Sequence, residues 1–307
     1  MAVREDRFRR AEQAFWASYD ARPTERWLEL TRPATRVRAV EFGEGPPLLF
    51  LHGGPGAGTI FAPVVSLLND FRCIAIDRPG CALSPTIPPP GARVAETMAE
   101  VFRSCLDSLD IERVRIVTSS FGGTCALWLA LRYPERIERI CHLGCPAFLA
   151  GMQMPFMIRV LATPLLGYVA ARLPMNRRGV LTFLRSMGEG RLVDAGRVSE
   201  AFIDFWMALV NDTDTMQNDR EMIRSAASFR GLPPELVLPD ETIKAMDIPT
   251  YFYWGADEPF GTAEYATSLA SGMRDGAIDV VPEVGHIPWL GEREDCAARI
   301  RSFMKNV

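Results

Sequence analysis

Two adjacent serines, Ser119 and Ser120, stand in the stretch IVTSSFGG, between an apolar run and a segment with a helical pattern. A serine hydroxyl attacks a carbonyl only when a base removes its proton and when it stands clear of the backbone. A tight strand-to-helix turn meets the second need, but it requires small residues two positions before and after the serine. Around Ser120 these are Thr118 and Gly122, whereas around Ser119 they are a valine and a phenylalanine. Sterics therefore favour Ser120 as the nucleophile.

Thr118 is the weak point of this turn, because a β-branched residue occupies a position that normally takes glycine. We expect either that the turn opens slightly or that the following helix carries a small residue beside Thr118.

Donors for a developing oxyanion are expected on two segments. The backbone N–H of Phe121 follows Ser120 at the start of a helix, where N–H groups are free and the helix dipole is positive. The stretch HGGPG follows a buried strand, and its glycines allow close approach of a ligand to the backbone. Gly54 is our choice for the second donor.

The base is expected to be one of three histidines. His52 belongs to the glycine-rich loop, where a structural role is expected, and His142 lies within an apolar strand and is expected in the core. His286 follows the last predicted strand, at the same sheet edge as Ser120, and is the predicted base. The acid that orients it should follow the preceding strand, where Asp257 and Glu258 are adjacent.

These side chains need a scaffold, and the sequence alternates predicted strands with predicted helices. Such alternation indicates an α/β fold with a mainly parallel sheet covered on both faces. Ligands and catalytic groups then gather at the carboxyl ends of the strands. Strands are predicted at residues 35–43, 46–54, 71–80, 113–120, 136–145, 248–255 and 276–283, and helices at 5–20, 93–109, 122–134 and 290–304.

The alternation stops between about residues 146 and 247, which read as helices and turns rich in proline, methionine and aromatic residues. The prediction is therefore one α/β core, residues 1–145 and 248–307, with a helical insertion at 146–247. We expect the insertion to close over the site as a lid. Its methionines and aromatic rings suggest an adaptable apolar pocket, although many of them must pack the lid onto the core.

Five motifs in this order resemble the α/β-hydrolase superfamily over nearly the whole chain from about residue 34. They are the serine turn, the His-Gly loop at His52, the turn DRPGCALS with Ala82 in place of a glycine, the acid segment, and Gly-His-x-Pro at His286. The resemblance implies an eight-stranded type of sheet and a Ser120–His286–acid triad with an acyl-enzyme mechanism. Counting three residues from Gly255 favours Glu258 as the acid, with Asp257 as the alternate.

The leading hypothesis for function is a carboxylesterase acting on short or medium acyl esters or on aromatic esters. Alternatives are a proline iminopeptidase-like aminopeptidase, in which lid acids (Glu189, Asp194, Glu200, Asp204) would hold the substrate amine, and a hydrolase that cleaves carbon–carbon bonds of ring-cleavage products. A non-enzymatic ligand receptor on this fold is the fourth. Candidate substrate contacts are Gly53, Ser119, Phe148, Trp206 and Ile287.

The composition of the chain argues against some classes of binding partner. The chain has 307 residues and a formal net charge of −4, with no basic surplus for nucleic acid. Seven scattered cysteines and a charged N-terminus fit a cytoplasmic protein. The apolar run at 155–174 is interrupted by arginines and a proline, so no membrane span is expected.

No cofactor or metal is predicted. The stretch CHLGC lacks zinc spacing. The stretch NDTDTMQND lacks the features of a calcium loop and is interpreted as a solvated turn. The sequence leaves the oligomeric state open.

Overall fold

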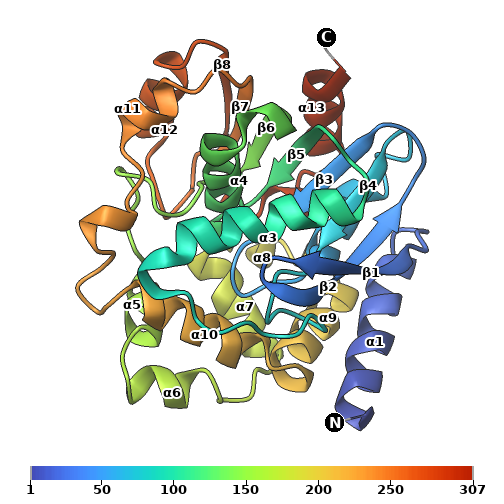
Figure 1. The fold of residues 1–307 in the computed structure, drawn as a ribbon. Coiled ribbons are helices and arrows are strands. Elements are labelled where there is room, and N and C mark those ends of the chain that lie inside the picture. Colours follow the sequence, from blue (N-terminus) through green and yellow to red (C-terminus); the bar gives the residue numbers. More distant parts are fainter. Residues whose placement is uncertain (1, 306–307) are drawn as a thin grey trace.

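The computed structural model describes residues 2–305 and contains an eight-stranded sheet (Figure 1). The strand order is β1-β2-β4-β3-β5-β6-β7-β8. β1 pairs antiparallel with β2, and β2 with β4, while every other pairing is parallel. The strands are β1 (Thr24–Thr31), β2 (Ala34–Phe42), β3 (Pro47–Leu51), β4 (Arg72–Ile76), β5 (Val114–Thr118), β6 (Ile137–Leu143), β7 (Thr250–Gly255) and β8 (Gly276–Val281).

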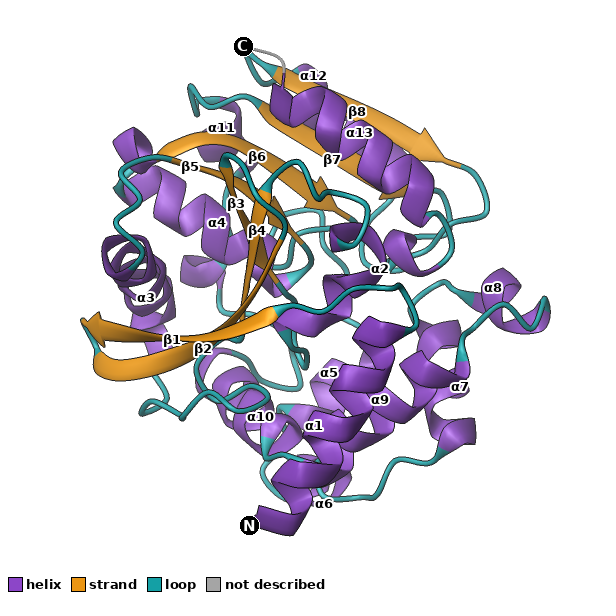
Figure 2. Ribbon diagram, turned by 90° about the vertical axis from the view of Figure 1, so that its right-hand side faces the viewer, coloured by secondary structure: helices purple, strands orange, loops and turns teal. Residues whose placement is uncertain are grey.

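Helices cover both faces of the sheet, as the view along it shows (Figure 2). Alternate residues of a strand point to opposite faces of the sheet, so one strand can contribute side chains to the apolar core on each face. Leu49 and Leu51 of β3 pack with α3, α4 and α12, whereas Leu48 and Phe50 pack with α1, α2 and α13. These helices are α1 (Ala2–Ala17), α2 (Ala62–Val65), α3 (Val94–Ser108), α4 (Phe121–Arg132), α12 (Ala263–Ser271) and α13 (Arg293–Lys305).

A second group of helices lies between β6 and β7 in the chain. Most of them lie in the lower part of Figure 1, whereas α11 (Asp240–Lys244) lies at its upper left beside α12. It corresponds to the predicted insertion at residues 146–247, and we call it the helical insertion. Its α9 packs along α1 at the N-terminal end of the chain. The group comprises α5 (Phe156–Leu161), α6 (Leu166–Ala170), α7 (Arg177–Ser186), α8 (Gly190–Asp194), α9 (Glu200–Asp212), α10 (Thr215–Ala226) and α11 (Asp240–Lys244).

The predicted α/β fold class is confirmed, and the predicted strands each contain an observed one. The edge strand β1 was not predicted. The stretch read as a solvated turn is instead the end of α9 and the start of α10. The apolar run at 155–174 forms the two short helices α5 and α6, and within residues 2–305 no helix has both the length and the apolar character to cross a membrane.

Candidate active site

Ser120 sits at the corner between β5 and α4, in a backbone conformation that few non-glycine residues adopt. Its φ is 51° and its ψ is −123°. Strain of this kind persists only where the surroundings enforce it. Here the enforcement is close packing, because a β-carbon built on Gly122 would lie 2.0 Å from the carbonyl oxygen of Leu51 in β3. A β-carbon on Gly53 would lie 2.7 Å from the β-carbon of Ser120, so the glycine-rich loop also passes directly against the serine.

Thr118 fits the corner because small and polar neighbours surround it. Its hydroxyl lies 2.7 Å from Nδ1 of His142, and a β-carbon on Gly123 of α4 would lie 3.2 Å from Thr118 Oγ1. The small residue expected on the following helix is thus Gly123. His142 stacks on Phe252 in the core, and burial lowers the pKa of its imidazole to about 3, so it remains neutral.

His286 is held by Glu258 in a buried pair. Its Nδ1 lies 2.7 Å from Oε2 and 2.9 Å from Oε1 of that carboxylate. The carboxylate also accepts hydrogen bonds from the backbone N–H of Cys145 at 2.8 Å and of Phe260 at 3.1 Å. Asp257, the alternate acid, instead points outward, 43% exposed, with Oδ2 3.7 Å from Nε of Arg191.

The loop after β6 connects this pair with the serine. The N–H of Cys145 bonds to Glu258, and the N–H of Ala147 donates to the carbonyl oxygen of Ser120 at 3.1 Å. The other imidazole nitrogen of His286, Nε2, is buried and has no hydrogen-bond partner among residues 2–305. A buried polar atom without a hydrogen-bond partner needs an explanation. One explanation is that Nε2 bonds to a reacting group only when a substrate is bound.

The two expected oxyanion donors belong to two segments that adjoin Ser120, the start of α4 and the glycine-rich loop. Phe121 is the first residue of α4, where backbone N–H groups have no partner within the helix. Gly54 follows β3 and lines the same pocket as Ser120 and Phe121. Neither N–H donates a hydrogen bond inside the described part of the chain.

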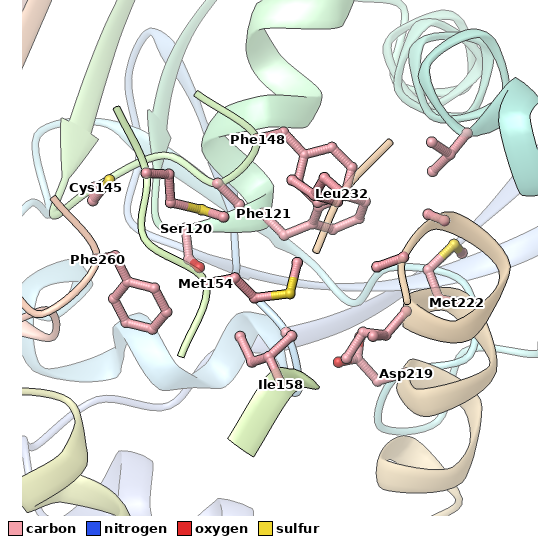
Figure 3. Close-up of a pocket in the computed structure, with 17 residues that line it drawn as sticks. Ser120, Phe121, Cys145, Phe148, Met154, Ile158, Asp219, Met222, Leu232 and Phe260 are labelled. Carbon is pink, nitrogen blue, oxygen red and sulfur yellow. The ribbon is translucent and has the colours of Figure 1, made fainter. Parts of the chain in front are cut away.

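A pocket opens from Ser120 between the core and the helical insertion (Figure 3). Phe148 lines it as predicted, and Met152, Met154 and Met222 supply flexible apolar walls. Its one charged lining residue is Asp219 of α10, whose side chain points into the cavity in Figure 3. The remaining lining residues are Val94, Cys145, Ala147, Ile158, Ile223, Ala226, Ala227, Leu232 and Phe260.

Four of the predicted substrate contacts, Gly53, Ser119, Trp206 and Ile287, are not among the residues that line this pocket. Trp206 is buried within the insertion, where its ring stacks on Phe183 at 4.8 Å. Ile287 is buried behind His286, and Ser119 is buried with its N–H bonded to Leu51. Gly53 contacts Ser120 itself.

The insertion also contacts the histidine loop, which the sequence reasoning did not foresee. The N–H of His286 donates to the carbonyl of Met187 at 2.8 Å, and the N–H of Ile287 donates to Glu189 Oε1 at 2.7 Å. Burial raises the pKa of the Glu189 carboxyl to about 7. Of the other insertion acids considered for an amine, Asp194 pairs with Arg185 and Glu200 with Arg177 at the surface. Asp204 is exposed on α9 and is not among the residues that line the pocket.

The described residues contain no group of three or more histidine, cysteine or carboxylate side chains placed to hold a metal ion.

A family model described as alpha/beta hydrolase fold matches residues 46–290. The chain belongs to the alpha/beta hydrolase fold family. This α/β hydrolase is 28% identical over 255 residues to the 2-hydroxy-6-oxo-6-phenylhexa-2,4-dienoate hydrolase of Comamonas testosteroni, which covers 80% of this chain and 83% of that protein. It is 23% identical over 289 residues to a cis-3-alkyl-4-alkyloxetan-2-one decarboxylase of Shewanella oneidensis, covering 90% and 87%.

Among solved structures, carboxylesterase CesB of Bacillus subtilis matches the fold of this α/β hydrolase with a TM-score of 0.76. The identity is 21%, and the match covers 99% of both chains. The family and the hydrolase of Comamonas testosteroni support hydrolase activity. Because the relatives act on different bonds, the reaction has to be argued from the site.

Proposed function

We propose that the protein is a serine carboxylesterase with Ser120 as nucleophile, His286 as base and Glu258 as the acid that orients it. The observation that carries the proposal is a strained serine on an apolar pocket whose lining residue Cys145 bonds to the carboxylate of a buried histidine–carboxylate pair. The helical insertion forms one wall of that pocket and acts as its lid.

In this mechanism His286 Nε2 takes the proton of Ser120 as Oγ attacks the ester carbonyl. Glu258 stabilises the imidazolium, and the N–H groups of Gly54 and Phe121 stabilise the oxyanion. The imidazolium then protonates the leaving alcohol. Water, deprotonated by the same His286, hydrolyses the acyl-enzyme and restores the serine.

The pocket lining argues for a neutral acyl group. Its walls are apolar, and no lysine or arginine is among its lining residues. A dienoate, the substrate type named for the relative from Comamonas testosteroni, carries a carboxylate, and the pocket lining offers no lysine or arginine to pair with it. An aminopeptidase would need a free carboxylate for the substrate amine, yet Asp219 already pairs with Arg78. Ester hydrolysis is therefore the reaction that the lining favours.

The test is a substrate panel run on wild type, Ser120→Ala and Ser119→Ala. The panel contains p-nitrophenyl esters from acetate to decanoate, a proline naphthylamide and a 2-hydroxy-6-oxodienoate. We expect ester turnover and labelling by a fluorophosphonate probe in wild type and in Ser119→Ala. Ser120→Ala should lose about 10³-fold or more in kcat and should not label.

Ser119→Ala is the matched control, because it removes the neighbouring hydroxyl from the same turn. Faster turnover of the dienoate or of the naphthylamide than of every ester would overturn the esterase assignment. Absence of both turnover and labelling in wild type would point to a ligand receptor.

A further inference from the structure

The strongest feature outside the proposed triad is a buried ion pair between the core and the helical insertion. Arg78, which follows β4, is 1% exposed, and its Nη2 donates to Asp219 Oδ1 of α10 at 3.1 Å. The same Nη2 donates to the carbonyl oxygen of Gly53 at 3.0 Å. One guanidinium nitrogen thus joins a carboxylate of the insertion to the loop that carries Gly54.

A histidine provides a second donor to the same carbonyl. His52 Nε2 accepts the backbone N–H of Arg78 at 3.1 Å, so the ring proton must reside on Nδ1. Nδ1 lies 2.6 Å from the Gly53 oxygen and therefore donates to it. Burial, and secondarily the charge of Arg78, hold the pKa of His52 well below its ordinary value, so the ring keeps this neutral form.

The geometry of the peptide unit gives these contacts a function. The peptide between Gly53 and Gly54 is trans, and in a trans peptide the N–H points opposite to the C=O. Two donors that hold the Gly53 oxygen therefore also fix the direction of the Gly54 N–H. Hydrogen bonds in a chain polarise one another. When the Gly53 carbonyl accepts from a guanidinium, the Gly54 N–H of the same peptide unit therefore becomes a stronger donor.

Asp219 completes the arrangement from the insertion. A β-carbon built on Gly54 would lie 2.7 Å from both of its carboxylate oxygens, so the carboxylate presses against the loop itself. Its charge is opposed by Arg78, and the pair adds no net charge beside the oxyanion site. The guanidinium also lies 5.0 Å from the ring centroid of Phe121, the residue with the other expected oxyanion N–H.

We infer that Arg78, anchored by Asp219, is a positioning residue that aims and polarises the Gly53–Gly54 peptide so that the Gly54 N–H stabilises the oxyanion. The helical insertion thereby supports transition-state stabilisation as well as forming the pocket. This inference rests on the proposed esterase function.

Arg78→Gln is the primary variant, and it should weaken the transition state without weakening substrate binding. We expect kcat/KM for a p-nitrophenyl ester to fall about 10- to 100-fold, which is no more than the effect of removing one oxyanion donor. The KM should change by less than about threefold. The inhibition constant of an alkyl trifluoromethyl ketone, which forms a tetrahedral oxyanion adduct, should rise in parallel. A ketone-free ether of the same chain length should bind unchanged.

Asp219→Asn tests the carboxylate that anchors Arg78. Because it keeps the shape of the side chain, it serves as a second variant if Arg78→Gln fails to fold. It should raise the inhibition constant of the trifluoromethyl ketone about 3- to 10-fold. Because Asp219 acts through Arg78, the double variant should be no worse than Arg78→Gln alone. The lysine variant Arg78→Lys should recover part of the loss, since an ammonium can donate to Gly53.

Arg220→Gln is the matched control. Arg220 is the next residue of α10 and is also buried, but it donates to Thr163 and Pro164 within the insertion. It should lower thermal stability and leave the ratio of ketone to ether affinity unchanged. Loss of stability in Arg78→Gln without a change in that ratio would overturn the inference, as would full additivity in the double variant. Failure of wild type to label with the fluorophosphonate would overturn the esterase proposal and this inference together.

Discussion

The two sides of the pocket are built differently. On the core side, each proposed catalytic group is fixed by backbone packing or by several hydrogen bonds, as for Glu258, which receives two N–H groups in addition to His286. On the insertion side, the walls include partly exposed methionine and isoleucine side chains on the loop before α5, on α5 and on α10, and these side chains have no such bonds to fix their rotamers. We propose that the core carries the catalytic groups, and that the insertion selects the acyl group and supports the glycine-rich loop through Asp219.

The largest expected effect tests the core side and compares two adjacent acids. Glu258→Gln should lower kcat for a p-nitrophenyl ester by about 10³- to 10⁴-fold, because an amide cannot hold the imidazole tautomer and charge that the reaction needs. Asp257→Asn should stay within about twofold, since Asp257 faces solvent near Arg191. Steady-state kinetics on both variants decides between them, and the reverse order would make Asp257 the acid.

The next expected effect concerns Glu189 of the helical insertion, which accepts a hydrogen bond from the loop that carries His286. The pKa of Glu189 is about 7 in the folded protein, raised by burial from its ordinary value of 4.5. The folded state therefore binds a proton that the unfolded state releases above about pH 4.5. The resulting stabilisation is complete below that pH and is lost as the pH rises through 7, by about 3 kcal/mol in all.

Urea unfolding at several pH values between 4.5 and 7.5 measures this loss. Glu189→Gln keeps an oxygen for the Ile287 N–H but cannot ionise, so its stability should change with pH by about 3 kcal/mol less than that of wild type. Subtracting the two profiles removes the contribution of other buried acids such as Asp77, whose pKa burial raises to about 6. Parallel profiles would show that Glu189 ionises freely in the folded protein.

The smallest effect tests the insertion side. Phe148→Ala and Met154→Ala should each enlarge the pocket and shift the preferred p-nitrophenyl ester to a longer acyl chain. The ratio of kcat/KM for long and short esters should change about tenfold, the amount that one or two methylene groups contribute in an apolar pocket. Phe156→Ala is the control, because Phe156 lies close by on α5 but is 72% exposed. Equal selectivity in all three variants would assign the pocket no role in acyl choice.

The comparison also explains what the sequence could predict. The fold class and the strand-end positions of Ser120, Glu258 and His286 follow from local signals: alternating hydrophobicity, glycine at tight corners and the residues just beyond each strand. The contacts made by the insertion have no such signal. Asp219 stands in a polar stretch that reads as a solvated turn, and only the packing of α10 against the core buries it beside Arg78. Trp206 illustrates the converse, since its aromatic ring packs inside the insertion and not at the pocket.

The close contact between Gly122 and the Leu51 carbonyl limits which parts of a protein like this one can change during evolution or engineering. It joins the serine corner to the strand that leads into the glycine-rich loop so tightly that no side chain can enter between them. The spacing between Ser120 and the glycine-rich loop is therefore fixed by the sheet itself. On the proposed function, an evolving or engineered descendant can replace other parts of the helical insertion and so acquire new substrates. It has to retain Asp219, which pairs with Arg78, and the bonds from Met187 and Glu189 to the loop that carries His286.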